Sequence, residues 1–200
     1  MGETRTEEEG VNLESIWQVH AKYIVSEIKS GLVIIDQHVA HERVLFEQAM
    51  GAMEGHPLPS QSLLFPEVVE LPIEDFSTLL ELLPYLEKIG FRMKEFGKNT
   101  VMIEGVPSEL GWGNEREVLT EIIDTFRNQQ KAQPSFMEAV AASFACKAAV
   151  KAGDALTHEE MQSLVDRLFA TQHPYYCPHG RPIIINLSIN ELDQRFERNS

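Results

Sequence analysis

The stretch "IIDQHVAHERVLFEQ", residues 34–48, decides how we expect this chain to fold and where its chemistry lies. The apolar run that ends at Asp36 is typical of a buried strand. A helix is expected from about His38 to Met53, because Gly55 and Pro57 follow it as a stop signal. The stretch therefore predicts a strand-to-helix junction that is rich in carboxylate and imidazole side chains.

Three of these side chains are expected to converge at the junction. Asp36 ends the strand, and His38 and Glu42 are spaced i and i+4, which places them on one face of the helix. Carboxylate and imidazole together suit zinc or manganese. Glu47 lies partly round the helix, and His41 lies off the shared face and is expected to meet solvent. The alternative is a helix whose acidic first turn complements the helix dipole and whose polar face is solvated.

The rest of the chain predicts an α+β fold. Alternating apolar residues from Trp17 to Val25 predict a strand, and a turn at 29–31 leads to the strand 32–36. Residues 67–133 resemble a self-contained unit that is inserted into the other part, formed by 11–66 and 134–200. Residues 1–10 are expected to be a flexible lead-in. Further elements are expected as helices at 74–90, 114–130, 134–153 and 157–172, a hairpin at 91–106 and a strand at 183–189.

Composition narrows the class of protein. With 43% hydrophobic residues in a chain of 200, a packed core is expected. No apolar stretch approaches the roughly 20 residues of a membrane span, and the polar start is not a signal peptide, so a cytoplasmic location is expected. The net charge of −14 argues against a domain that grips DNA by its own field. No GxSxG elbow, P-loop or dinucleotide fingerprint is present.

Two further segments carry residues that can bind metal. Cys177 and His179 are two residues apart in the loop "CPHGRP", and a thiolate and an imidazole held in this way are good zinc ligands. The alternative is a turn with a buried cysteine. Cys146 lies in an alanine-rich helix, where a lone cysteine usually behaves as a small apolar side chain.

Together these segments resemble the carboxy-terminal domain of the MutL family of DNA mismatch-repair proteins, in the lineages whose MutL is an endonuclease. The family signature DQHA-x2-E-x4-E is matched by "DQHVAHERVLFE", with Val39 where alanine is usual. Lys147 takes the place of an arginine in the family's second motif. The other matching segments are "SFACKAAVKAGDAL" (143–156), "CPHGRP" (177–182) and "FER" (196–198).

The resemblance implies a metal-dependent endonuclease that nicks one strand of double-stranded DNA. Zinc would have a structural or regulatory role, and manganese or a similar divalent ion would support nicking. Glu47 is counted among the catalytic residues with Asp36, His38 and Glu42, and it would orient ligands or contact a phosphate together with Arg181 and Arg198. The metal ligands that the resemblance implies are Asp36, His38, Glu42, Cys146, Cys177 and His179.

The resemblance also implies partners. "QSLLFP" is similar to the family's sliding-clamp-binding motif, with Gln61, Leu63, Leu64 and Pro66 as its contact residues, although an ordinary strand would have the same composition. Residues 67–133 would be an outer regulatory part, and the remainder would form the dimerisation part with the metal site. The implied partners are a second copy of the chain, double-stranded DNA, the sliding clamp, MutS and an N-terminal ATPase region of the same protein.

Two other interpretations remain open at this point. The first is a non-catalytic dimerisation module with a structural zinc, which would need Cys146, Cys177 and His179 but would gain nothing from Asp36. The second is an unrelated α+β binding protein that holds no metal.

Overall fold

The computed structural model describes residues 15–110, 113–129, 136–177 and 180–198. Helices occur together with antiparallel sheets, which confirms the predicted α+β class. The chain divides into two compact units, residues 1–41 with 150–200 and residues 42–149. The expected lead-in, residues 1–10, and the predicted metal ligand His179 lie outside the described residues.

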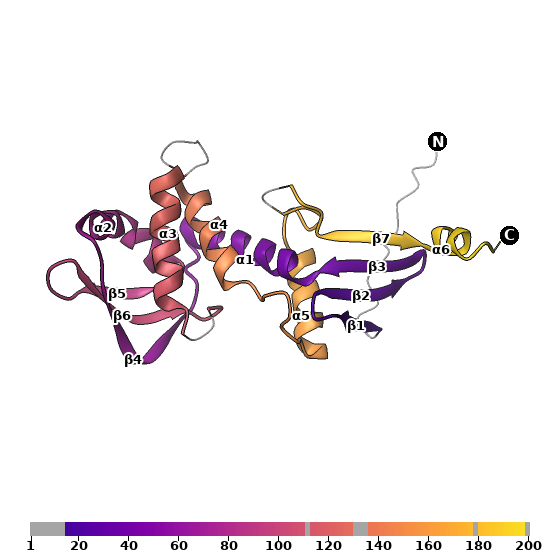
Figure 1. Ribbon diagram of the computed structural model, residues 1–200, viewed down its shortest axis with the longest axis horizontal. Helices are drawn as coiled ribbons and strands as arrows, with labels where there is room; N and C mark the ends of the chain where they lie inside the picture. Colours follow the sequence, from indigo (N-terminus) through magenta and orange to yellow (C-terminus); the bar gives the residue numbers. More distant parts are fainter. Residues whose placement is uncertain (1–14, 111–112, 130–135, 178–179, 199–200) are drawn as a thin grey trace. The chain divides into compact units, whose positions relative to one another are not determined.

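The first unit contains a four-stranded antiparallel sheet in the order β1-β2-β3-β7 (Figure 1). Gly31 starts β3 with a positive φ, and a Cβ there would collide with the carbonyl oxygen of Leu187 in β7. The glycine of the predicted turn therefore allows the two strands to approach closely. The elements of this unit are β1 (Ile16–Val19), β2 (Tyr23–Ile28), β3 (Gly31–Asp36), α5 (His158–Phe169), β7 (Ile184–Ser188) and α6 (Ile189–Arg195).

The single strand expected from Trp17 to Val25 is wrong, because a tight turn divides it into β1 and β2. His20 and Ala21 both have positive φ, and Val19 pairs directly with Tyr23 across the turn. Trp17 pairs with Val25 in the same register. The odd-numbered apolar residues therefore share one sheet face as predicted, but they do so across a hairpin.

The two faces of this sheet differ in burial. Ile24, Val33 and Ile35 are buried, and they share one face because strand residues alternate in direction. On the other face, Trp17, Tyr23 and Ile185 remain 42%, 42% and 55% exposed. α5 begins with a capping box, Thr157 with Glu160, as its sequence predicts.

The second unit contains a three-stranded antiparallel sheet in the order β4-β6-β5. α1 begins at Gln37, directly after β3, and the larger part of its length belongs to this unit. Its elements are α1 (Gln37–Glu54), β4 (Ser60–Glu70), α2 (Ile73–Lys88), β5 (Arg92–Glu95), β6 (Thr100–Pro107), α3 (Glu115–Gln129) and α4 (Phe136–Ala148).

One apolar core holds the second unit together. Leu79, Leu82 and Leu86 of α2 recur every three or four residues and are fully buried in it. Leu45 of α1 and Phe144 of α4 are buried in the same core. Since both flanking helices contribute to it, this unit (42–149) is longer than the inserted part expected from the sequence (67–133). The regulatory role of that part stays a prediction.

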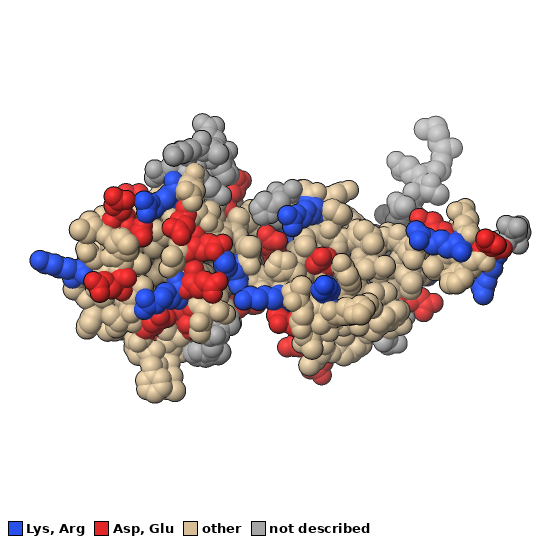
Figure 2. Space-filling view, in the orientation of Figure 1, with Lys and Arg blue, Asp and Glu red and all other residues tan. Residues whose placement is uncertain are grey.

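Charge is unevenly distributed over the second unit. Asp and Glu side chains gather around α3, with Lys and Arg side chains between them (Figure 2). No helix in the described ranges combines the length and the hydropathy that a membrane span requires.

Candidate functional site

Asp36 stands at the end of β3 and caps α1. Its Oδ1 accepts hydrogen bonds from the backbone N–H groups of His38 at 3.0 Å and Val39 at 3.1 Å. A side chain that accepts from these amides is an N-cap, because the first amides of a helix have no partner within the helix. Asp36 therefore has a structural role in addition to the metal-binding role predicted for it.

His38 and His41 both bond to the backbone of Val150. His38 Nδ1 lies 2.8 Å from the carbonyl oxygen of Val150, and the backbone N–H of Val150 donates to His41 Nδ1 at 3.0 Å. The prediction that His41 meets solvent is wrong, since it is only 8% exposed. The segment after α4 packs over this face of α1 and excludes solvent from it.

Gln37, which the sequence analysis did not single out, is fully buried and fixes the same segment. Its Nε2 donates to the carbonyl oxygens of Ala21 at 2.9 Å and of Asp154 at 3.1 Å. Gln18 Nε2 donates to Gln37 Oε1 at 2.6 Å and to the carbonyl of Asp154 at 2.9 Å. The start of α1 thus holds residues 150–154 through the side chains of Gln37, His38 and His41.

The loop "CPHGRP" is a tight turn around a buried sulfur. Cys177 is 5% exposed, and its Sγ accepts a hydrogen bond from the backbone N–H of Arg181 at 3.3 Å. The backbone N–H of Cys177 donates in return to the carbonyl of Arg181 at 2.9 Å, and Gly180 has a positive φ. The side chain of Arg181 is exposed. The turn fixes the sulfur, but His179, its predicted companion, lies outside the described residues.

Arg198, predicted to contact a phosphate or orient a ligand, follows the short helix α6. Its guanidinium lies 5.9 Å from the centre of the Phe196 ring, and Phe196 is 71% exposed. Ser188 and Glu191 form the capping box that starts this helix.

In the second unit, α1 carries buried charged side chains, whereas the alternative interpretation predicted a solvated polar face. Glu42 is 8% exposed and Arg43 is 6% exposed. Arg43 Nη2 donates to Glu47 Oε1 at 2.5 Å, one helical turn away. Within the described residues, Arg43 Nε is buried without a hydrogen-bond partner. These charged side chains therefore do not form the solvated helix face of the alternative interpretation.

Cys146 on α4 lies in a negative field within the second unit. Partial burial raises the pKa of the Cys146 thiol, and the carboxylates of Glu42 and Glu121 raise it further. The ammonium of Lys147 acts in the opposite direction and is itself paired with α3, 2.7 Å from Glu121 Oε2. Two of the predicted metal ligands, Glu42 and Cys146, are therefore near enough to interact electrostatically.

The segment predicted to bind a sliding clamp bulges out of β4 (Figure 1). Residues 63–66 lie opposite the single residue Glu104 of β6. Leu64 is 81% exposed and Phe65 is 82% exposed, although Phe65 was not among the predicted contact residues. Gln61 instead donates through Nε2 to the carbonyl of Leu110 at 2.9 Å, within its own unit. An uncharged projection is visible at this place in Figure 2.

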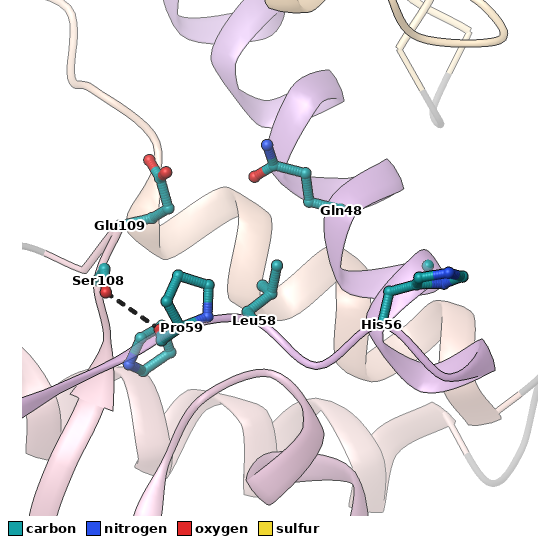
Figure 3. Close-up of a pocket in the computed structure, with 8 residues that line it drawn as sticks. Gln48, His56, Leu58, Pro59, Ser108 and Glu109 are labelled. Atoms are coloured by element: carbon teal, nitrogen blue, oxygen red, sulfur yellow. Dashed lines mark hydrogen bonds between the residues drawn. The ribbon is translucent and has the colours of Figure 1, made fainter.

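None of the predicted ligands that the structure describes lines a cavity of about 390 Å³ in the second unit. Leu58, Pro59 and Pro107 supply apolar walls, and His56 and Glu109 are the ionisable side chains at its rim (Figure 3). One imidazole and one carboxylate are fewer donors than a zinc site uses. Among the described residues, no three His, Cys, Asp or Glu side chains are grouped closely enough to hold a metal ion.

Comparison with known proteins identifies the family. The model of the MutL C terminal dimerisation domain matches residues 16–156. The chain belongs to the MutL C-terminal dimerisation domain family. The matched range contains Asp36, Glu42, Glu47 and Cys146, whereas Cys177, Arg181 and Arg198 follow it.

Relatives named DNA mismatch repair protein MutL match nearly the whole chain. The protein of Chlorobium phaeobacteroides (strain BS1) is 46% identical over 197 residues, which cover 95% of this chain and 32% of the relative. The protein of Prosthecochloris aestuarii is 47% identical over 184 residues, which cover 92% of this chain and 30% of the relative. The chain thus spans about a third of the length of the curated relatives it matches.

Proposed function

We propose that this domain acts in DNA mismatch repair as a metal-dependent endonuclease that nicks one strand of double-stranded DNA and joins two copies of its protein. The observation that carries the nuclease part is the hydrogen bond from His38 Nδ1 to the carbonyl of Val150. A carbonyl oxygen only accepts, so neutral His38 bears its proton on Nδ1 and its lone pair on Nε2. Histidines that bind metal are usually oriented in this way.

The donor chemistry at the junction fits a divalent cation. Asp36 has one oxygen committed to the helix cap, which fixes the orientation of its carboxylate. Manganese accepts carboxylate and imidazole donors, and zinc accepts imidazole and thiolate. When bound, the ion would lower the pKa of a water molecule and offset the charge that develops on the phosphodiester. Asp36 and His38 would hold the ion, and Glu47 and Arg181 would orient its ligands or the phosphate.

A zinc ion would relieve the electrostatic conflict around Cys146. Partial burial is the main cause of the raised pKa of this thiol, and the carboxylates of Glu42 and Glu121 raise that pKa further. A divalent cation close to Glu42 would favour the thiolate, because a nearby positive charge stabilises an anion. The proposed ligands for this structural or regulatory ion include Cys146, Cys177 and His179.

The sliding clamp would solve the problem that the net charge of −14 creates for DNA binding. Leu64 and Phe65 project from the bulge of β4 as adjacent apolar anchors, and Pro66 is exposed beside them. An exposed apolar peptide of this kind docks in a groove of a partner. A clamp that already encircles DNA would raise the effective concentration of the domain at its substrate.

A second copy of the chain would cover the exposed apolar face of the first unit's sheet. Family membership supports a homodimer. Trp17, Tyr23 and Ile185 are exposed on one face, and burying such residues is the usual driving force for a stable dimer. MutS and an N-terminal ATPase region of the same protein would control nicking.

The decisive assay is Mn²⁺-dependent nicking of supercoiled plasmid DNA by the wild-type chain and by Asp36→Asn, with the clamp present. We expect nicked circles from the wild type and none from the variant, because asparagine keeps the helix cap but loses the charge that holds the ion. Equal nicking by both proteins would contradict the assignment of Asp36. If neither protein nicks but both retain zinc, the domain is a dimerisation module with a structural zinc.

A further inference from the structure

The bulge of β4 that carries Leu64 and Phe65 is held at its first end by Arg92 of β5. Ser62, Gly105 and Arg92 are directly paired across β4, β6 and β5, so they share one face of the sheet. Arg92 Nη2 donates to Ser62 Oγ at 2.5 Å. Gly105 makes this contact possible, because a Cβ there would lie 2.6 Å from Arg92 Nε. The side chain of Arg92 therefore crosses the middle strand and binds the residue that precedes the bulge.

Arg116 of α3 holds the other end of the bulge. Its Nε donates to Glu67 Oε1 at 3.0 Å, and its Nη2 donates to the carbonyl oxygen of Val68 at 3.0 Å. Glu67 is the residue at which β4 resumes its pairing with β6, opposite Ile103. The planar guanidinium thus binds the side chain of one residue and the backbone of the next, which the single ammonium of a lysine does not reproduce.

Two side chains of the same segment are directed into their own unit. Gln61 Nε2 donates to a backbone carbonyl of this unit at 2.9 Å, and Leu63 is partly buried against the apolar core. Pro66 has a fixed φ and restricts the preceding residue, Phe65, to an extended conformation. Gln61 and Leu63 therefore anchor the segment, whereas Leu64 and Phe65 remain 81% and 82% exposed.

We propose that Arg92 and Arg116 are positioning residues that hold the β4 bulge in one conformation, preorganised to dock in an apolar groove of a partner. The bulge then presents Leu64 and Phe65 as a fixed pair of apolar side chains. A segment that is already ordered loses less conformational entropy on binding than a free peptide does. The partner is the sliding clamp, so the consequence for binding rests on the proposed function, whereas the rigidity of the bulge does not.

Nitrogen-15 relaxation of the isolated chain tests the rigidity of the bulge without any partner. A rigid backbone amide has an order parameter of about 0.85, and a flexible one falls below about 0.6. In the wild type, we expect the amides of Leu64 and Phe65 to be in the rigid range. In the double variant, Arg92→Ala with Arg116→Ala, both amides should be in the flexible range. Flexible amides in the wild type, or rigid amides in the double variant, would overturn the proposal whether or not the clamp binds.

Affinity for the sliding clamp, measured by fluorescence anisotropy, tests the consequence for binding. A synthetic peptide of residues 59–69 carries the exposed pair but neither arginine. We expect the wild-type chain to bind at least about 10-fold more tightly than this peptide, because its bulge is ordered before binding. The double variant should approach the affinity of the peptide. A double variant that binds as the wild type does would overturn the proposal. If the wild-type bulge is rigid but neither chain nor peptide binds the clamp, the rigidity stands and the proposed partner fails.

Matched variants separate positioning from a general loss of charge. Arg127→Ala removes another arginine of α3, whose ion pairs with Glu74 and Asp75 lie on α2, and it should change neither the rigidity of the bulge nor the affinity for the clamp. Arg116→Lys keeps the charge but not both bonds, so it should give intermediate values. An Arg116→Lys variant identical to the wild type would overturn the role of the guanidinium geometry. Loss of the dimer in Phe65→Ser would assign the bulge to a second copy of the chain and would also overturn the proposal.

Discussion

Replacing Asp36 by alanine and by asparagine separates its role as a helix cap from its proposed role as a metal ligand. The capping role can be measured in the absence of any metal. Oδ1 accepts two backbone N–H groups at the start of α1, at 3.0 and 3.1 Å. Loss of such a cap costs about 1 kcal/mol of stability, within a range of about 0.5–2 kcal/mol. Asparagine ranks with aspartate as an N-cap, so Asp36→Asn should retain nearly all of this stability.

The assay is equilibrium unfolding in urea of the metal-free wild type and of both variants, at one protein concentration. We expect Asp36→Ala to lower the free energy of unfolding by about 1 kcal/mol with an unchanged slope against urea. Asp36→Asn should unfold close to the wild-type midpoint. Equal losses in both variants, or no loss in Asp36→Ala, would refute the cap. Both variants should fail to nick DNA, so only Asp36→Asn is a clean test of catalysis.

Three further predictions concern the exposed and electrostatic features. Changing both Leu64 and Phe65 to serine should weaken binding to a sliding clamp at least about 10-fold in a fluorescence anisotropy titration, with stability changed by less than about 0.5 kcal/mol. Ile185→Glu places a charge on the exposed sheet face and should convert a dimer into monomers in sedimentation velocity, and a dimer that persists would exclude this face. Alkylation of Cys146 should show an apparent pKa above that of an ordinary thiol. That pKa should fall in Glu42→Gln, because removing a nearby negative charge favours the thiolate.

Matched substitutions make these results specific. Asn186→Glu adds the same charge one residue further along β7, on the opposite side of the strand, and should leave the dimer intact. Glu81→Gln removes an exposed carboxylate of α2 that is not among the groups acting on the thiol, so the pKa of Cys146 should not change. A shift in either control would mean that the effect is general and does not arise from the named contact.

The parts of the fold set by short-range patterns were predictable from the sequence. The helix after Asp36 and the capping box of α5 follow from local spacing and start signals. The turn at His20 and Ala21 was missed because neither residue is glycine, asparagine or proline, and the apolar alternation continues across it. The alternation of apolar residues shows which residues share a sheet face, but it does not show where the chain reverses direction.

The site was less predictable because its side chains are fixed by backbone groups distant in the sequence. The His41 contact with Val150 spans 109 residues, and no local pattern signals it. Gln37 is buried and bonds to Ala21, which precedes it in the sequence, and to Asp154, which follows it by more than 100 residues. Phe65 is exposed because four residues bulge opposite one, a register shift that composition does not show. Spacing therefore identified the metal-capable residues but not the groups that orient them.

The central claim is that a metal ion belongs to this domain, and its metal content tests that claim most directly. Elemental mass spectrometry would be applied to the wild type and to Cys177→Ser, both purified without chelator. We predict near-stoichiometric zinc in the wild type and its loss in the variant, because the "CPHGRP" turn fixes the Cys177 sulfur in a buried position. No metal in the wild type, even after zinc is added, would contradict the proposed metal site.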